Sequence, residues 1–201
     1  MKKRIGLFGG SFDPIHTAHL IMASVIRQEF DLEKIIFIPN YVSPFKENFS
    51  ISDISHRTEM IKLSISGNKK FGISDFEALQ KRAVYTCETV EYFKSLYPDH
   101  NLSLIMGYDA YKSLKKWKNS DYILENAEII IAERSELAEI DPDHTGFRVS
   151  ISRNCPKMEI SSTTVRKMVA DNLNIKYLVN EKVRHYIIRK NIYNGNLNKL
   201  V

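Results

Sequence analysis

The chain carries Gly9-Gly10-Ser11-Phe12-Asp13-Pro14-Ile15-His16-Thr17-Ala18-His19 directly after the apolar run Arg4-Ile5-Gly6-Leu7-Phe8. The run is nearly continuous rather than alternating, which is typical of a strand buried on both faces in a parallel sheet. The paired glycines let the backbone turn sharply after this strand and approach a ligand closely. Pro14 disfavours helical geometry in the residue before it, so we expect a helix to begin near His16 or Thr17.

His16 and His19 stand one helical turn apart at the start of the expected helix. Their side chains share one side of the first turn, where unpaired backbone N–H groups and the helix dipole favour an anion. A histidine pair at this spacing also suits a zinc site or a polar helix end. However, no third ligand stands at metal spacing, the His-Glu-x-x-His pattern is absent, and Cys87 and Cys155 are far apart. We therefore interpret the pair as a solvent-reached phosphate site and predict no metal site.

Length and composition predict an ordinary globular protein. The chain has 201 residues, 43% hydrophobic and 26% charged, with a formal net charge of +5. We expect a single domain over 1–201, with a small helical appendage at about 160–201. Basic residues are scattered, so the charge fits phosphorylated substrates, and we predict neither nucleic acid nor a membrane as partner. Two cysteines, no signal-like segment and no bilayer-length apolar stretch predict a cytoplasmic protein.

Strand-like and helix-like segments alternate along the rest of the chain. We expect further strands at 34–39, 71–74, 101–106, 128–132 and 147–151, and helices at 53–66, 84–97, around Trp117, after Ser161 and near 179–187. This order implies right-handed crossovers and a Rossmann-like, doubly wound α/β fold with a mostly parallel sheet and helices on both faces. Ligands of such folds bind beyond the carboxyl ends of the strands. Gly9, Asn40, Gly107 and Arg134 follow expected strands, so we expect one site to collect them.

A second polar motif, Ile160-Ser161-Ser162-Thr163-Thr164-Val165-Arg166, stands late in the chain. Ser161 or Ser162 is a natural N-cap for a helix whose apolar stripe begins at Val165. A well-capped helix with no ligand is the structural alternative. Because Arg166 lies one turn from Ser162 on the same face, we interpret the helix start as a second anion clamp.

The chain lacks both the Gly-x-Gly-x-x-Gly of dinucleotide folds and the Gly-x-x-x-x-Gly-Lys-Ser/Thr of P-loop enzymes. Its own two motifs resemble instead the nucleotidylyltransferase superfamily, and further segments resemble the bacterial nicotinate-nucleotide adenylyltransferase family. Those segments span nearly the whole chain: Ile38-Pro39-Asn40 with Pro44 and Lys46, Tyr85-Thr86 with Thr89, Gly107-x-Asp109 with Trp117, and the tail from Tyr177 through Val183 to Tyr193. The chain departs from the family pattern at Ala18, Phe45 and Val84, where glycine, histidine and serine are common.

The resemblance implies a reaction. The phosphate of nicotinate mononucleotide would attack the α-phosphorus of ATP in line, without a covalent enzyme intermediate, giving nicotinate adenine dinucleotide and pyrophosphate. A phosphate monoester is largely deprotonated at neutral pH, so the reaction requires no general base. The protein must supply alignment and charge stabilisation. Mg²⁺ should arrive with ATP, held by phosphate oxygens and water.

The resemblance also implies roles for particular residues. The catalytic group comprises His16 on the α-phosphate, His19 on the neighbouring phosphates, Arg166 on the pyrophosphate and Lys46 on the opposite side. The other implied ATP and phosphate contacts are Gly9, Gly10, Ser11, Phe12, Gly107, Asp109, Ser162 and Thr163. The implied mononucleotide contacts are Asn40, Tyr85, Thr86, Trp117 and Arg134.

Alternatives stay open beside these roles. Trp117 could be a core residue and Arg134 an ordinary surface arginine, whereas His56, His100, His144 and His185 have no motif around them and are expected to be structural. The acceptor could instead be an amidated mononucleotide or phosphopantetheine. A non-catalytic nucleotide- or RNA-binding protein is a third hypothesis, although the intact histidine pair argues against it. The oligomeric state stays open, a homo-oligomer included.

Overall fold

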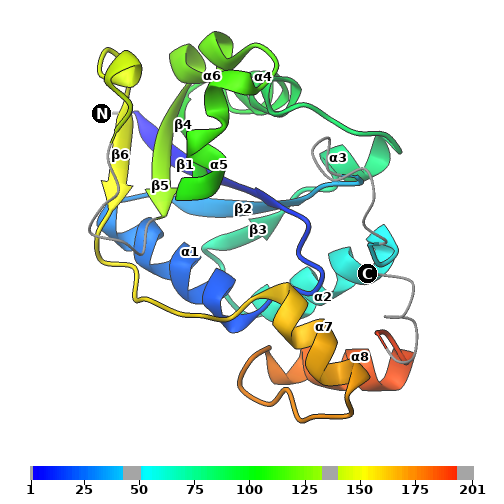
Figure 1. The fold of residues 1–201 in the computed structure, drawn as a ribbon. Helices are drawn as coiled ribbons and strands as arrows, with labels where there is room; N and C mark the ends of the chain where they lie inside the picture. Colours follow the sequence, from blue (N-terminus) through cyan, green and yellow to red (C-terminus); the bar gives the residue numbers. More distant parts are fainter. Residues whose placement is uncertain (1, 43–50, 133–139, 194–201) are drawn as a thin grey trace.

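One parallel sheet organises the chain, in the strand order β3-β2-β1-β4-β5-β6 (Figure 1). The computed structural model describes residues 2–42, 51–132 and 140–193. The strands are β1 (Lys3–Gly10), β2 (Lys34–Pro39), β3 (Phe71–Ile73), β4 (His100–Gly107), β5 (Ala127–Ala132) and β6 (Val149–Ser152). Every pair of neighbours runs parallel, and β1 lies between β2 and β4. The expected doubly wound α/β fold is therefore confirmed.

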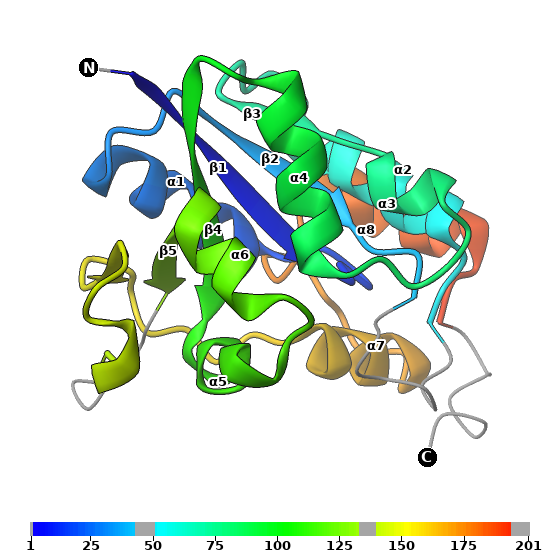
Figure 2. The same ribbon diagram turned by 90° about the horizontal axis from the view of Figure 1, so that it is seen from above.

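Helices cover both faces of the sheet (Figure 2). The helix α1 (Thr17–Glu29) lies with α2 (Ile54–Ile65) on one face, and α4 (Thr86–Leu96) lies with α6 (Ser120–Asn126) on the other. The remaining elements are α3 (Phe76–Leu79), α5 (Tyr108–Lys112), α7 (Ser162–Ala170), α8 (Glu181–Lys190) and the 3-10 turns η1 (Leu114–Lys116) and η2 (Pro142–His144). Because these strands run parallel, β1, β2, β4 and β5 all end at the same edge of the sheet.

The alternating side chains of β1 divide the core into two layers. Ile5 and Leu7 belong to the apolar cluster beneath α4 and α6, whereas Phe8 belongs to the cluster beneath α1 and α2. Gly6 faces this second layer so closely that a Cβ there would come within 2.9 Å of Leu32 Cδ1. The glycine is therefore required for packing.

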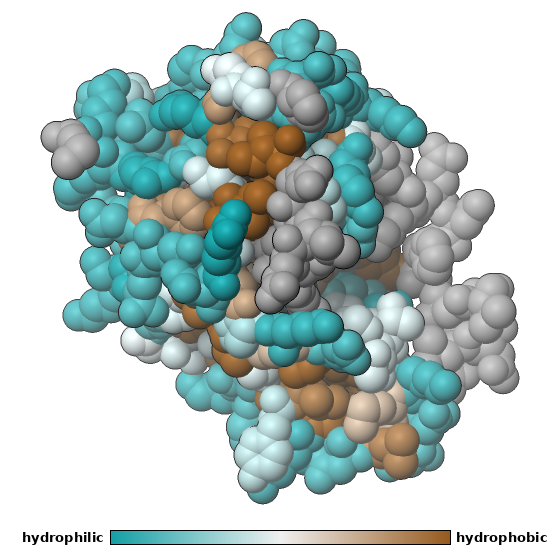
Figure 3. Space-filling model, turned by 60° about the vertical axis from the view of Figure 1, so that its left-hand side comes forward, coloured by the Kyte–Doolittle hydropathy of each residue, from teal (hydrophilic) through white to brown (hydrophobic). Residues whose placement is uncertain are grey.

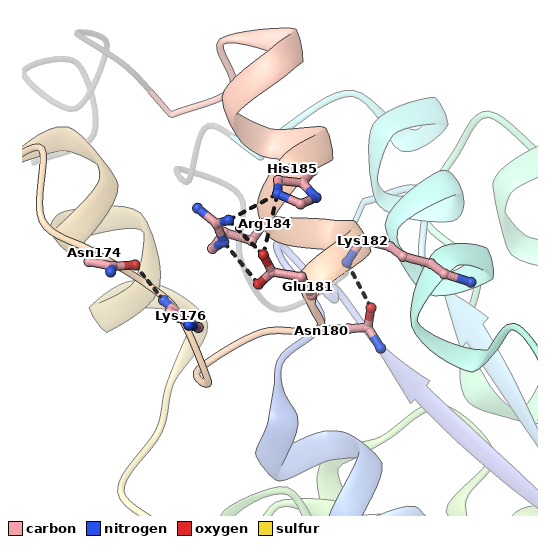
Figure 4. A network of polar contacts seen from close by, with 7 residues as sticks. All are labelled: Asn174, Lys176, Asn180, Glu181, Lys182, Arg184 and His185. Carbon is pink, nitrogen blue, oxygen red and sulfur yellow. Dashed lines mark hydrogen bonds and ion pairs between the residues drawn. The ribbon is translucent and has the colours of Figure 1, made fainter.

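The C-terminal helices belong to the layer of α1 and α2. Val183 and Ile187 of α8 are fully buried in that cluster, and α8 packs against α2. Asn180 caps α8 by accepting a hydrogen bond from the Lys182 N–H at 2.9 Å. Figure 4 shows this cap beside an ion pair in which Arg184 contacts Glu181 at 2.6 Å. The turn before α8 is thus fixed locally, and it brings the chain back to the start of α1.

One expected element is wrong. The segment around Trp117 is not a helix but the succession α5, η1 and α6, with Trp117 extended at φ −78° and ψ 147°. Asn119 adopts a left-handed φ of 50° between η1 and α6, and asparagine tolerates this conformation better than most residues. The bend there ends one short helix and begins the next.

The surface carries no helical membrane segment among the residues described. None of these helices combines the length and the apolar character that a bilayer crossing needs. Figure 3 shows one face on which hydrophilic residues dominate and apolar residues form separate patches. Scattered apolar patches of this kind are ordinary on a folded protein surface.

Candidate active site

The loop after β1 is held in an unusual backbone conformation. Phe12 has a φ of 48°, which is uncommon for a residue other than glycine. Its ring is buried against Phe8 and Phe37, with centroid distances of 5.5 and 5.7 Å. A Cβ at Gly10 would lie 3.1 Å from that ring, whereas a Cβ at Gly9 would meet nothing within 4 Å. The ring of Phe12 is therefore part of the core, whereas the space beside Gly9 is open.

The histidine pair forms the start of α1, as expected. His16 is the N-cap, and its backbone N–H donates to Nδ1 of His19 at 3.2 Å. The two rings stack with centroids 3.7 Å apart. Because Nδ1 of His19 accepts a hydrogen bond, the proton of the neutral ring resides on Nε2, which becomes a donor. We expected His16 to be reached by solvent, but it is only 5% exposed because it lies in the N-cap turn beneath the stacked ring.

Two backbone donors that we expected to face an anion already have protein partners. Besides the N–H of His16, the N–H of Thr17 is used, donating to the carbonyl of Leu178 at 2.8 Å. The Thr17 hydroxyl likewise donates to the carbonyl of Tyr177 at 2.8 Å. The two donors of Thr17 are occupied because the turn before α8 returns to this helix end, whereas the N–H of His16 is occupied by His19. The anion-binding capacity therefore comes chiefly from the side chains and from the loop before α1.

The second motif contacts the first. Ser161, rather than Ser162, caps α7, since its hydroxyl accepts the Thr164 N–H at 3.0 Å. Ser162 is thereby left to donate its hydroxyl to the carbonyl of Pro14 at 2.9 Å. Arg166 donates from Nη1 to the carbonyl of Asp13 at 2.7 Å and from Nη2 to Oγ1 of Thr163 at 3.3 Å. Residues from opposite ends of the sequence thus meet at one loop.

Arg57, which is not among the residues predicted from the sequence, holds the main chain of this loop by hydrogen bonds. Its side chain is only 1% exposed and donates hydrogen bonds to four main-chain carbonyls. The acceptors are Ser11, Asn40, Tyr41 and Ser52, at 2.7 to 3.0 Å. Burial lowers the pKa of Arg57, and the Asp13 carboxylate opposes that shift. The available signal was its spacing with Met60 and Ile61, which places a cation on the buried stripe of a helix.

Two further predicted residues lie at the ends of their strands. Asn40 follows β2, and its N–H donates to the Gly10 carbonyl at 3.1 Å. Its Oδ1 is buried and makes no hydrogen bond within the described residues. Gly107 ends β4, where an added Cβ would meet nothing within 4 Å. The end of β2 therefore offers a side-chain oxygen without a partner, and the end of β4 offers open space beside its backbone.

Three of the five predicted mononucleotide residues, Tyr85, Thr86 and Trp117, lie on the α4 side. Tyr85 is the N-cap of α4, directly before Thr86, and Nζ of Lys118 lies 4.5 Å from the centre of its ring. Trp117 precedes that lysine, is half-buried against the α4–α6 layer and donates from Nε1 to Oγ of Ser113 at 3.0 Å. Trp117 therefore has both a packing role and an accessible part. Lys118 was not anticipated from the sequence.

One predicted residue that the structure describes, Asp109, is not joined to this arrangement. Asp109 extends into solvent and, within the described residues, pairs locally with Lys112 of α5 at 2.8 Å. Lys46 and Arg134 lie outside the described residues. Their roles stay predictions. By contrast, the four remaining histidines have structural partners, as expected: His56 with Tyr186, His144 with Tyr111, His100 with Glu33 and His185 with Glu181.

Comparisons with known proteins agree with this geometry. Residues 7–168 match the cytidylyltransferase-like family. A probable nicotinate-nucleotide adenylyltransferase of Caldicellulosiruptor saccharolyticus is 37% identical over 196 residues, covering 94% of this chain and 98% of the relative. The protein of the same description from Christiangramia forsetii is 38% identical over 194 residues, covering 96% of this chain and 100% of the relative.

Solved structures also match over almost the full length. The nicotinic acid mononucleotide adenylyltransferase of Plasmodium falciparum, solved in complex with APC, superposes with a TM-score of 0.76 at 25% identity, covering 97% of this chain and 99% of that one. A structure of the Plasmodium falciparum enzyme in complex with NaAD gives a TM-score of 0.77 at 24% identity, which bears on the fold alone. The chain belongs to the cytidylyltransferase-like family and, through its full-length relatives, to the nicotinate-nucleotide adenylyltransferases.

Proposed function

We propose that the protein transfers the adenylyl group of ATP to nicotinate mononucleotide and releases pyrophosphate. The observation that carries this proposal is the contact of the two motifs, in which Arg166 donates to the Asp13 carbonyl at 2.7 Å. That contact sets a guanidinium beside the loop leading into the histidine pair. A polyphosphate is the ligand class that such a convergence of cation, imidazoles and open backbone suits.

In the proposed reaction, an oxygen of the mononucleotide phosphate bonds to the α-phosphorus of ATP. The bond from that phosphorus to the oxygen bridging to the β-phosphate breaks, and pyrophosphate leaves with the electron pair. Because the nucleophile is already largely deprotonated at neutral pH, no side chain has to take a proton. The protein acts by aligning two anions and stabilising the charge that develops.

The residues divide this work between the two motifs. His19 presents its Nε2–H, and His16 beside it completes a donor pair for the α-phosphate and its neighbours. Arg166 and the first turn of α7, with Ser162 and Thr163, would hold the leaving pyrophosphate. Nε of Arg166 is buried and makes no hydrogen bond within the described residues, so this N–H is available to a phosphate oxygen. Gly9, Gly10, Ser11 and the backbone of Phe12 would line the other side.

The nicotinate end would lie on the α4 side of the sheet edge. At the N-terminus of α4 the N–H of Tyr85 already donates to Oε1 of Glu88 at 3.1 Å, so in this proposal the backbone donors begin at Thr86, and Trp117 offers an aromatic surface. Asn40, whose Oδ1 makes no hydrogen bond within the described residues, lies beside the end of β1. In the proposal Lys46 and Arg134 contact phosphate, and Gly107 and Asp109 face the ATP sugar.

Mg²⁺ enters this proposal bound to ATP, and when bound it neutralises phosphate charge. Phosphate oxygens and water are sufficient ligands for this cation. Among the described residues, no group of three or more His, Cys, Asp or Glu side chains is placed to hold a metal ion. The donor set of this described part of the chain fits a cation carried by the substrate better than one held in a carboxylate cage.

Pyrophosphate release tests the function. Purified protein is incubated with ATP, Mg²⁺ and one acceptor at a time: nicotinate mononucleotide, its amide, or phosphopantetheine. We expect the acid mononucleotide to give the highest kcat/KM. Preference for either other acceptor would identify a sister adenylyltransferase, and absence of turnover with all three would favour a nucleotide-binding protein.

The substitution Arg166→Ala tests the second clamp. Loss of a charge-assisted phosphate contact should raise the KM for ATP about tenfold or more while changing the KM for the mononucleotide little. Arg184→Ala is the matched control, because Arg184 pairs with Glu181 on α8 outside the site. An unchanged dependence on ATP in Arg166→Ala would remove this arginine from the site.

A further inference from the structure

The side chain of Asp13 is a buried carboxylate that has no part in the proposed reaction. It lies in the loop between β1 and α1, residues 11–16, which we call the phosphate loop. It is 4% exposed, and three remote segments bond to it. Its main-chain carbonyl accepts from Arg166, its Oδ2 accepts from the Ser52 N–H at 3.2 Å, and its Oδ1 accepts from the Tyr193 hydroxyl at 2.7 Å. Asp13 thus receives hydrogen bonds from α7, from the segment before α2 and from the turn after α8.

The bond from Tyr193 is the most remote of the three, because 180 residues separate donor and acceptor. The ring of Tyr193 packs against the core layer of α1, α2 and α8, which fixes the hydroxyl in place. Burial, and then the negative charge of Asp13, raises the pKa of Tyr193 well above its ordinary value. The hydroxyl therefore keeps its proton and remains a donor.

The hydrogen bond from Tyr193 to Asp13 matters because of where Asp13 lies in the loop. Asp13 lies between the glycines at the end of β1 and the histidine pair, and Arg166 also donates a hydrogen bond to this loop. A carboxylate free to rotate there would repel the triphosphate and would let the backbone before His16 shift. The donors from Tyr193 and Ser52 occupy both of its oxygens and restrain that movement.

We propose that Tyr193 is a positioning residue, whose hydroxyl holds the Asp13 carboxylate and with it the backbone of residues 11–16 in the geometry needed for adenylyl transfer. Tyr193 does not touch the substrate in this scheme. The kinetic part of the inference rests on the proposed function, whereas the restraint on the loop does not.

Tyr193→Phe tests the proposal by removing one hydroxyl and keeping the ring. We expect backbone amide exchange over residues 11–16, measured by mass spectrometry without ligand, to become about tenfold faster. With substrates, kcat should fall about tenfold or more while the KM for nicotinate mononucleotide changes less than about twofold. Assays are run well below the melting temperature of every variant.

Tyr186→Phe is the matched control. Its hydroxyl also lies in a hydrogen bond near the C-terminus, but its partner is Nδ1 of His56 in α2, at 2.9 Å, and not a residue of the loop after β1. This variant should keep the exchange rates of residues 11–16 and the kcat of the parent protein. Unchanged exchange in Tyr193→Phe, or an equal change in both variants, would overturn the proposal. If the parent protein turns over no acceptor, the proposed function fails, and the exchange comparison still decides whether Tyr193 restrains the loop.

Discussion

His16 shows at the scale of one residue how a short motif combines structure and chemistry. Its backbone N–H fixes the ring of His19, while its own ring stacks on that neighbour at 3.7 Å. His16→Ala should lower kcat by about 10²- to 10³-fold, the range for loss of one charge-stabilising donor. The N-cap backbone and the hydrogen bond to His19 do not need the imidazole, so far-UV circular dichroism should stay unchanged. His185→Ala on the exposed face of α8 is the control, and equal activity of both variants would show that the reacting centre lies elsewhere.

Glu77 makes a pH dependence predictable from a single carboxyl. It is buried, accepts a hydrogen bond from the Thr89 hydroxyl at 2.7 Å, and burial raises its pKa from 4.5 to about 7. The fold therefore favours the protonated form, so this stabilisation is complete below about pH 4.5 and is lost as the pH rises to about 7. The loss amounts to about 3 kcal/mol at most.

Glu77→Gln keeps an acceptor for Thr89 and cannot ionise. Its free energy of unfolding in urea should therefore exceed that of the parent protein at pH 8 by up to about 3 kcal/mol, and the gain should be small at pH 5. Glu125→Gln, at an exposed position of α6, should give no such difference between the two pH values. A gain of equal size at both values would mean that Glu77 is not the group responsible.

At the scale of elements, the sequence predicts what local rules govern. The apolar β1, the glycine turn, the helix beginning at His16 and the capped α7 each follow from a few neighbouring residues. The helix expected around Trp117 is wrong, because no proline or glycine marks the bends there and Asn119 nevertheless turns the chain. The four carbonyl acceptors of Arg57 come from distant loops, and no local pattern could reveal them. The resemblance to the adenylyltransferase family implied the site residues. The contacts that hold these residues in place are seen only in the folded structure.

The two serines that begin α7 separate capping from loop contact. Ser161→Ala removes the acceptor of the Thr164 N–H and should cost about 1 kcal/mol of stability, with little effect on KM for ATP. Ser162→Ala removes the hydroxyl bound to the Pro14 carbonyl and should chiefly impair ATP use. Thermal unfolding and steady-state kinetics on both variants distinguish the two roles. The reverse assignment of effects would show that Ser162 acts as the cap.

At the scale of the whole molecule, the C-terminal helices pack into the same apolar core as β1 at the start of the chain. Val165 of α7 and Ile187 of α8 are buried in one apolar cluster with Ile26 of α1 and Met60 of α2. The site lies where this closure meets the sheet edge, so the ends of the chain must fold together before the two motifs can meet. The single domain expected from the sequence is therefore a prediction about cooperativity as well as about shape.

Urea unfolding tests this cooperativity. Trp117, the only tryptophan, reports on the α4–α6 layer on the opposite side of the sheet from α8, whereas far-UV circular dichroism reports on all helices. We expect both signals to share one midpoint. Ile187→Ala, at a fully buried position of α8, should lower the free energy of unfolding by about 2–5 kcal/mol. The urea midpoints of the two signals should therefore fall by the same amount. If the residues from about 160 onward folded as a separate appendage, Ile187→Ala would shift part of the circular dichroism transition and leave the Trp117 fluorescence midpoint in place.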